Sequence, residues 1–582
     1  MESFDLVIVG AGIHGLVALK TYIDVHPNAS ILVIDKGSSL GGVWAVDRLY
    51  PGLHTNNHFR TFEYSDYPMK TDGFNLENDH IPGEHVYQYL CNYAQQFNLT
   101  KYIRLNTSVE LAVDRGSLGW TLTVADRTLA MPSATVIKTS KLTVATGLTS
   151  EPFMPKMVGR DEFQAPVYHT SEFAKAENGL GTFKKVVLLG GAKFSWDIAC
   201  AYASAGVQVD WVIRESGHGP CWMTPPRLTP FKIIPELLLQ TRLITWLSPC
   251  IWEDGFSYIR NFFSKHWLGR MVADKFFTKM QHNIEESNRY HEHPETAKLH
   301  PWDDVFFIGT NRGLLNYDVD FFEYVRNGTI RVHIANIERL SYHTVHLSDG
   351  KSVAAEVLIC GTGWKDTPQI EFKTERELGL PGHLPLNAEP YIAGADCEIL
   401  EKCPKLQHQP PRRNIKAMSE DADETTPEPY RLYRFMVPPA FVDSRSLVFA
   451  GAYRSGATIM VAQSQALWMT AFFDNNIPGL ECRTNVSSDR VMYETVLHTQ
   501  FGKWRYSKGF GARFPELWFE CLPYVDLLLK DIGVANQRKK SWWAERLTPY
   551  VPKDYQGIVD EYMALRSQPS IAIHSFNPRK HD

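Results

Sequence analysis

Two stretches of this chain repeat one order of apolar and polar positions. In the first, a β-branched apolar run ends at Val9, a glycine-rich turn and an amphipathic helical pattern follow, and a second apolar run covers residues 31–34. The same order returns at residues 184–213. Each copy predicts a buried strand, a turn, a helix and a second parallel strand, which is the unit of a doubly wound sheet. The predicted fold class is therefore α/β, with two doubly wound dinucleotide-binding domains.

Changes in this pattern divide the 582 residues into parts, because one core does not serve so long a chain. The first domain should take residues 1–165 and resume at residues 366–480. The second domain should take residues 166–365, and a helical C-terminal tail should follow at residues 481–582. Within the resumed first domain, residues 400–430 are polar and contain an acidic run, which predicts a surface loop.

An aromatic and apolar insertion is expected inside the second domain, at about residues 215–300. Glu236, Gln240 and Arg242 interrupt the apolar run of residues 231–252, so its helices should be amphipathic rather than membrane-spanning. Two interpretations stay open. The insertion is either a helical cap over a substrate channel or, through residues 231–252, a peripheral membrane contact.

Charge and cysteine content narrow the possible functions. The 60 basic and 65 acidic side chains leave a net charge of −5, which is too small and too mixed to indicate nucleic-acid binding. The nine cysteines include no Cys-x-x-Cys pair, so neither a disulfide framework nor a metal site is predicted, and a reducing, cytoplasmic location fits. No run of 18 uncharged apolar residues predicts a transmembrane helix.

The first glycine-rich turn has the spacing of a dinucleotide site. Gly10 permits a tight turn, Gly12 lets the backbone approach a pyrophosphate, and Gly15 lets the helix pack close to the sheet. The pyrophosphate would lie at the helix N-terminus, where free N–H groups favour an anion. Asp35 ends the following strand and should accept hydrogen bonds from the ribose hydroxyls.

The second turn departs from this spacing. It begins at Gly190, but Ala192 and Ser195 stand where the second and third glycines would be. The alanine adds only a methyl group, so the turn should survive, and the serine can donate to a phosphate. Arg214 replaces the acid at the end of the next strand, and its guanidinium would pair with a 2′-phosphate that a carboxylate would repel. This second set predicts NADPH rather than NADH.

Further motifs resemble a known family. Gly41-Gly42-Val43-Trp44 follows the first acid-bearing strand, and a segment from Tyr50 to Met69 comes next. With these motifs, roughly residues 1–475 resemble the flavin-containing monooxygenase family of class B flavoprotein monooxygenases. The resemblance implies that the first site binds FAD and that Asn56 lies near the flavin as the candidate catalytic residue. The expected FAD contacts are Gly10, Gly12, Gly15, Asp35, Lys36, Gly42, Val43, Trp44, Asn56, Val109, Thr146 and Gly147.

Two more segments are similar to family motifs. Residues 163–173 resemble the linker motif, with Ala165 in place of a glycine and His169 in the position that organises the linker. The segment lacks the tryptophan-containing ending typical of Baeyer–Villiger enzymes, which favours oxygenation of heteroatoms. Residues 522–533 resemble members associated with fungal secondary metabolism.

The resemblance also implies a reaction for which the protein supplies binding and orientation. NADPH would reduce FAD, the reduced flavin would capture O2 as a C4a-(hydro)peroxyflavin, and one oxygen atom would enter a small organic substrate. N- or S-oxygenation and Baeyer–Villiger oxidation both stay open. The alternative is a flavin-dependent NAD(P)H dehydrogenase or reductase without oxygen transfer, although the lack of a Cys-x-x-Cys relay speaks against a thiol reductase.

Overall fold

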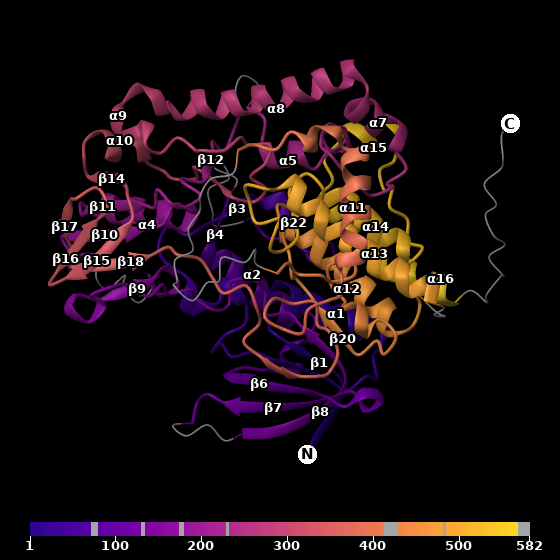
Figure 1. The fold of residues 1–582 in the computed structure, drawn as a ribbon. Helices are drawn as coiled ribbons and strands as arrows, with labels where there is room; N and C mark the ends of the chain where they lie inside the picture. Colours follow the sequence, from indigo (N-terminus) through magenta and orange to yellow (C-terminus); the bar gives the residue numbers. More distant parts are fainter. Residues whose placement is uncertain are drawn as a thin grey trace.

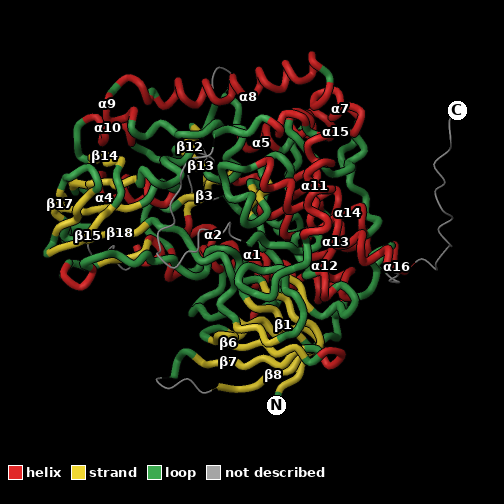
Figure 2. Tube along the Cα trace, in the orientation of Figure 1, coloured by secondary structure: helices red, strands yellow, loops and turns green. Residues whose placement is uncertain are grey.

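Two β-sheets form where the strand–turn–helix–strand pattern occurs in the sequence, and they occupy different regions of the molecule (Figure 1). The computed structural model describes residues 1–71, 80–129, 134–173, 180–228, 232–411, 428–480 and 485–567. Figure 2 shows helices gathered between and above the two sheets. The predicted α/β fold class with two doubly wound sheets is confirmed.

The first sheet joins strands from both ends of the sequence. Its strands are β1 (Glu2–Val9), β2 (Ile31–Ile34), β5 (Ile103–Arg104), β6 (Thr107–Asp114), β7 (Trp120–Asp126), β8 (Ala134–Val144), β19 (Glu371–Lys373) and β20 (Leu447–Phe449). Strand β1 lies between β2 and β8 in parallel register, and β6, β7 and β8 form an antiparallel meander. The last four residues of β1 are buried because the parallel part of the sheet is covered on both faces.

The second sheet is parallel throughout. Its strands are β9 (Val167–His169), β10 (Lys185–Leu189), β11 (Gln208–Ile213), β14 (Ile330–Ile334) and β18 (Val357–Cys360). Their order is β14-β11-β10-β18-β9, so the central strand β10 leads into the second glycine-containing turn. A three-stranded antiparallel sheet of β15 (Ile337–Ser341), β16 (Thr344–Leu347) and β17 (Ser352–Ala354) precedes β18 in the chain.

After β18 the chain returns to the first sheet. Strand β19 pairs with β6, and β20 pairs with β8. A helix that follows β20, α12 (Thr458–Phe473), has every residue from Ile459 to Phe473 buried. It packs against α1 (Ile13–Val25), the helix that opens at the first turn. Residues 412–427 of the predicted polar loop at 400–430 lie outside the described residues. The first residues of the 400–430 range form the end of helix α11 (Glu389–Lys402).

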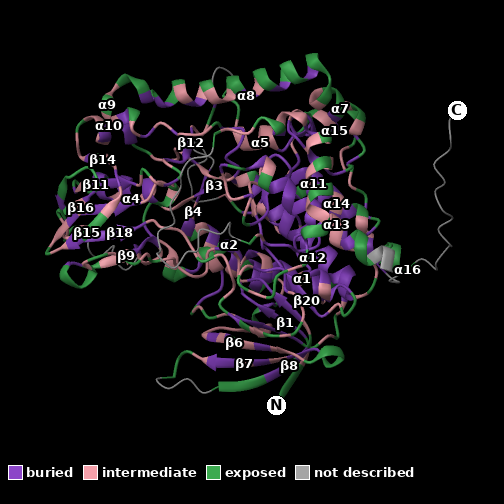
Figure 3. Cartoon of the chain, in the orientation of Figure 1, coloured by how far each residue is buried: buried purple, intermediate pink, exposed green. Residues whose placement is uncertain are grey.

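The insertion of the second domain is built mainly of helices. They are α5 (Pro235–Leu239), α6 (Arg242–Leu247), α7 (Ser257–Lys265), α8 (Trp267–Asn288) and α9 (Pro294–Ala297). Helix α8 runs along one side of the molecule and exposes much of its length (Figure 3). The insertion begins with β12 (Trp222–Thr224), which pairs with β13 (Arg312–Leu314) after the last of these helices.

The C-terminal part is helical, as predicted. Its helices are α13 (Asn485–Arg505), α14 (Cys521–Asp531), α15 (Trp542–Leu547) and α16 (Ile558–Ser567). Helix α14 packs against α12, and α15 lies beside α6 of the insertion. The remaining elements are α2 (Gly83–Gln96), α4 (Lys193–Ser204), α10 (Phe321–Arg326), β3 (His54–His58), β4 (His80–Pro82), β21 (Arg454–Ser455) and β22 (Glu516–Leu517). Among the helices that the structure describes, none is long and apolar enough to span a membrane.

Candidate cofactor and active site

The first turn gives each of its three glycines a different steric role. At Gly10, where φ is +114°, an added Cβ would lie 2.5 Å from the carbonyl oxygen of Ala145. At Gly15, an added Cβ would lie 1.8 Å from the carbonyl oxygen of Gly10, so only glycine lets α1 approach β1 this closely. At Gly12, an added Cβ would meet the Cα of Gly42 at 3.5 Å, an ordinary contact distance. The fold therefore requires Gly10 and Gly15, whereas Gly12 lets the backbone of Gly42 lie close to the helix N-terminus.

The Gly41-Gly42 pair closes onto this turn. The N–H of Gly41 donates to the carbonyl of Ala11 at 2.9 Å, and both glycines have positive φ. The structure thus brings Gly12 and Gly42 face to face, although 30 positions separate them in the sequence. Neither Gly12 nor Gly42 has a side chain, so the backbone at this helix N-terminus fits the pyrophosphate of FAD.

Asp35 follows β2 and turns its carboxylate toward the backbone of the first turn. Its Oδ2 accepts from the N–H of Ala11 at 2.6 Å, and its Oδ1 accepts from the N–H of Gly37 at 2.7 Å. A carboxylate that accepts two backbone N–H groups keeps the turn and the next loop in register. Contact of Asp35 with a ribose stays a prediction.

Several other predicted FAD contacts surround this cluster. The ammonium of Lys36 donates to the carbonyl of Ser150 at 3.2 Å, and the indole of Trp44 meets the ring of Phe62 edge-on, at 5.9 Å between centroids. Val43 is 45% exposed. Thr146 and Gly147 come directly after β8 and are half-buried.

Val109 and Asn56, two of the predicted FAD contacts, lie in opposite surroundings, one buried and the other exposed. Val109 is buried in the core of the first sheet, so any cofactor contact there falls to its backbone. Asn56 lies on β3 with its side chain exposed. Its neighbour Asn57 is half-buried and donates from Nδ2 to the carbonyl of Gly456 at 2.9 Å and to the carboxylate of Glu236 at 2.6 Å. Sequence reasoning missed Asn57 and Glu236, although Glu236 stands out as an acid within an apolar run.

The segment before α12 covers the first turn. The imidazole of His14 hydrogen-bonds the hydroxyl of Tyr453 at 2.8 Å, and an added Cβ at Gly451 would lie 2.9 Å from that imidazole. Burial lowers the pKa of His14 to about 4, so its ring is neutral at pH 7. The hydroxyl of Tyr64 also donates to the carbonyl of Ile13 at 2.8 Å. The start of α1 is therefore enclosed by segments from three parts of the sequence.

The second turn keeps its shape without the second and third glycines. Gly190 has φ +124°, and an added Cβ there would lie 2.3 Å from the carbonyl oxygen of Gly361. Ala192 is exposed at the N-cap of α4. Ser195 is fully buried, and its hydroxyl would lie 2.3 Å from a Cβ added at Gly361. The serine fits because Gly361 has no side chain, so its hydroxyl fills the space between α4 and the strand ends. A hydrogen bond from Ser195 to a phosphate stays a prediction.

Arg214 directly follows β11 and is half-buried. Burial lowers the pKa of its guanidinium from the ordinary value. A second cation in this region was missed by sequence reasoning. Lys193, at the start of α4, donates to Asp197 at 2.5 Å, to Asn316 at 2.9 Å and to Tyr317 at 3.1 Å. A lysine inside a glycine-containing turn was the available signal for it.

Two hydrogen bonds connect the two glycine-turn regions, and a third lies within the second sheet. The hydroxyl of Tyr50 donates to the carboxylate of Asp197 at 3.4 Å, and the amide of Asn316 donates to the carbonyl of Thr55 at 3.1 Å. His169, the predicted linker histidine, is buried and hydrogen-bonds the carbonyl of Gly363 at 2.8 Å. Burial lowers the pKa of its imidazole, which agrees with a structural position.

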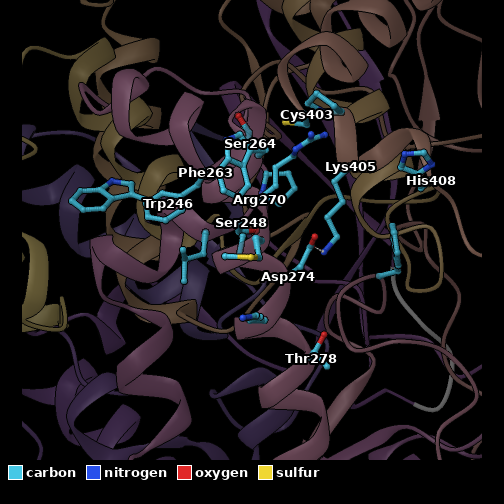
Figure 4. A pocket seen from close by; sticks show the side chains of 18 of the residues that line it. Trp246, Ser248, Phe263, Ser264, Arg270, Asp274, Thr278, Cys403, Lys405 and His408 are labelled. Carbon is cyan, nitrogen blue, oxygen red and sulfur yellow. Dashed lines mark hydrogen bonds and ion pairs between the residues drawn. The ribbon is translucent and has the colours of Figure 1, made fainter.

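A pocket of about 1010 Å³ lies on the insertion, away from these residues. Figure 4 shows Trp246, Phe263, Arg270 and the Asp274–Lys405 ion pair around it. None of the predicted cofactor residues lines this pocket. The described residues also contain no group of three or more His, Cys, Asp or Glu side chains that could hold a metal ion.

Two sheets, in each of which a parallel strand passes through a glycine-containing turn into a helix, define a protein with two dinucleotide-type sites. The comparison of sequences gives the family. Residues 4–250 match the flavin-binding monooxygenase-like family. Over 97% of this chain and 98% of the relative, the sequence is 32% identical to the FAD-dependent monooxygenase rstn6 of Aspergillus nomiae. The chain belongs to this family of flavin-binding monooxygenases.

Solved structures show the same fold at low sequence identity. Cyclohexanone monooxygenase from Rhodococcus sp. Phi1 bound to NADP⁺ has a TM-score of 0.58 and 15% identity, covering 91% of this chain and 98% of that one. S-allyl-L-cysteine S-oxygenase from Allium sativum has a TM-score of 0.51 and 14% identity, covering 97% and 94%. At these identities the likeness concerns the fold.

Proposed function

We propose that this protein is an NADPH- and FAD-dependent monooxygenase that transfers one oxygen atom of O2 to a small organic substrate. The observation that carries the proposal is the close approach of the Gly12 and Gly42 backbones at the N-terminus of α1, in a chain that belongs to the flavin-binding monooxygenase family. The NADP⁺ in the cyclohexanone monooxygenase structure and the Arg214 position support NADPH as the electron donor.

Each predicted residue then has a role that this chain can perform. FAD, when bound and reduced, supplies the centre that reacts with O2. The backbone from Gly10 to Gly15 would hold the pyrophosphate, and Asn56 would place its amide near the flavin. Arg214 binds the 2′-phosphate, and the insertion with α12 excludes water.

Oxygenation of a nitrogen or sulfur atom is the first candidate reaction, because residues 163–173 lack the tryptophan-containing ending described above. Oxidation of a ketone is the second candidate. The two solved structures compared above, an S-oxygenase and a cyclohexanone monooxygenase, have similar folds. The fold therefore supports both chemistries equally.

The test is oxygen transfer from labelled O2. Enzyme with NADPH and ¹⁸O2 should convert at least one of a panel of amines, sulfides and ketones into a product that carries one ¹⁸O atom, measured by mass spectrometry. NADPH consumption with release of all reducing equivalents as H2O2, for every compound in the panel, would favour the oxidase or reductase alternative.

Replacing Arg214 with alanine should raise KM for NADPH far more than KM for NADH. One or two charge-assisted contacts to a phosphate are worth about 1.5–3 kcal/mol, which corresponds to roughly 10- to 150-fold. Steady-state NADPH and NADH oxidation measures both constants. Arg339→Ala is the matched control because Arg339 is exposed on β15, outside the second turn. Equal changes for both cofactors would contradict the assignment of Arg214.

We also propose a cytoplasmic location. Peripheral membrane contact through residues 231–252 stays a prediction. Among the large apolar side chains of the described part of that segment, Ile233 and Leu243 are exposed, at 38% and 37%, while Ile244, Trp246 and Trp252 are buried. The insertion therefore turns most of this segment inward, which supports its role as a cap.

A further inference from the structure

The carboxylate of Glu236 accepts three hydrogen bonds from one segment that lies 175 to 179 positions away in the sequence. Glu236 lies on α5, within the insertion of the second domain. Its Oε1 accepts from the amide of Asn57 at 2.6 Å and from the hydroxyl of Thr61, and its Oε2 accepts from the backbone N–H of His58. All three donors belong to the segment that carries Asn56.

These donors are neutral, which makes the position unusual for a half-buried carboxylate. Burial raises the pKa of Glu236 to about 7, and the three hydrogen bonds oppose the rise. Burying an acid is costly unless hydrogen bonds compensate it. An apolar residue would fit the surrounding apolar run more easily, so the acid indicates a requirement for these specific contacts.

The contacts continue from Asn57 to the first turn. The same amide nitrogen of Asn57 donates to the carbonyl of Gly456, two residues before α12. Three residues earlier, the hydroxyl of Tyr453 hydrogen-bonds His14, which stands between Gly12 and Gly15. A continuous path of hydrogen bonds and short backbone segments therefore links the insertion to the pyrophosphate turn.

We propose that Glu236 is a positioning residue that fastens the insertion to the Asn56 loop and, through Asn57 and Gly456, to the segment covering the start of α1. With this carboxylate in place, the Asn56 loop and the segment before α12 keep one arrangement around the flavin. This inference rests on the proposed function, because the loop has this importance only where FAD binds beside it.

The experiment compares wild type, Glu236→Gln, Asn57→Ala and the double variant. Glutamine keeps the size of the side chain and one acceptor oxygen, but it turns an NH2 group toward donors at the other position, so at least one of the three hydrogen bonds is lost together with the negative charge. Each single variant should bind FAD about tenfold more weakly and, when reduced by NADPH without substrate, release H2O2 about tenfold faster. The double variant should be no worse than the poorer single variant, because both changes remove the same link. Flavin fluorescence and a peroxide assay give the two readouts.

The controls separate positioning from general damage. Glu253→Gln, an exposed acid of the same insertion, should match wild type in both readouts. A purely structural role would lower thermal stability of the apoprotein while leaving the flavin absorption spectrum and peroxide release unchanged. If Glu236→Gln does not fold, Thr61→Val removes one donor at nearly constant volume and should show the same changes to a smaller degree.

The outcomes also distinguish this inference from the proposed function. Wild-type values in Glu236→Gln, or losses that add fully in the double variant, overturn the role of Glu236 and leave the monooxygenase assignment standing. Wild-type protein that binds no FAD overturns the proposed function itself. If wild type binds FAD tightly but transfers oxygen to no compound tested, FAD affinity and H2O2 release in the variants still decide the role of Glu236.

Discussion

Gly12→Val should give folded protein that purifies without flavin. An added Cβ at this position lies 3.5 to 4.0 Å from the backbone of Gly42 and Gly41, which are ordinary contact distances. The branched side chain instead occupies the space beside the N-terminus of α1, where a pyrophosphate must approach the backbone. We expect FAD affinity to fall roughly 100-fold or more, by more than about 2.7 kcal/mol. The flavin absorbance per protein after purification, followed by titration with FAD, measures the loss.

Two further glycine variants make this prediction specific. Gly15→Ala should damage folding rather than binding alone, because its Cβ would lie 1.8 Å from the carbonyl oxygen of Gly10. Gly181→Val is the matched control, since Gly181 is exposed, has no positive φ and has no atom near its added Cβ. Yellow Gly12→Val protein with wild-type flavin content would contradict the assignment of this turn to FAD.

Local spacing was enough to predict the two turns. The steric role of Gly15 follows from a strand that passes directly into a helix, whereas that of Gly10 also depends on the carbonyl of Ala145 in the neighbouring strand region. The pairing of Gly12 with Gly42 is less local, because helix α1, strand β2 and a loop lie between them. Ser195 shows where spacing stops being sufficient. Its hydroxyl is enclosed by Gly361, which follows β18, the strand beside β10, and which no local pattern connects to it.

The hydrogen bonds of Asn57 are even less accessible to prediction from local spacing. Glu236 lies 179 positions from Asn57, and Gly456 lies 399 positions from it. Hydrophobic periodicity predicts that an acid in an apolar run faces solvent or the edge of a helix. Only the tertiary fold, which places α5 against β3, converts that acid into an acceptor for three donors.

The insertion is held to the C-terminal helices by a buried charge cluster that sequence analysis did not predict. Arg242 on α6 is fully buried and donates to Asp526 on α14 at 2.5 and 3.1 Å, and also to Glu545 on α15. Asp526 is 1% exposed and Glu545 is 4% exposed. The apolar run of residues 231–252 thus contains a cation whose two partners lie about 300 positions away, in the C-terminal tail.

Arg242→Met should destabilise the protein by about 3–5 kcal/mol, because it leaves two buried carboxylates without their cation. Thermal unfolding and protease susceptibility of α14 and α15 measure the effect, with the onset of tail cleavage reported separately because a chain of this size need not unfold in one step. Arg270→Met, at an exposed position on α8, is the control and should change stability little. Adding Asp526→Leu to Arg242→Met should recover part of the loss, since one buried carboxylate disappears.

The pH dependence of the stability lost in Arg242→Met tests whether the unpaired carboxylates cause that loss. Burial raises the pKa of Asp526 to about 6 even beside Arg242. Because the pKa of Asp526 is higher in the folded state, its protonation favours the native state. This contribution to stability is fully present below the pKa of the unfolded state and is lost as the pH rises through about 6. Removing the guanidinium must raise that pKa further. The stability deficit of Arg242→Met should therefore be smaller in mildly acidic buffer than in mildly alkaline buffer. A deficit independent of pH would assign the effect to lost packing of the arginine side chain instead.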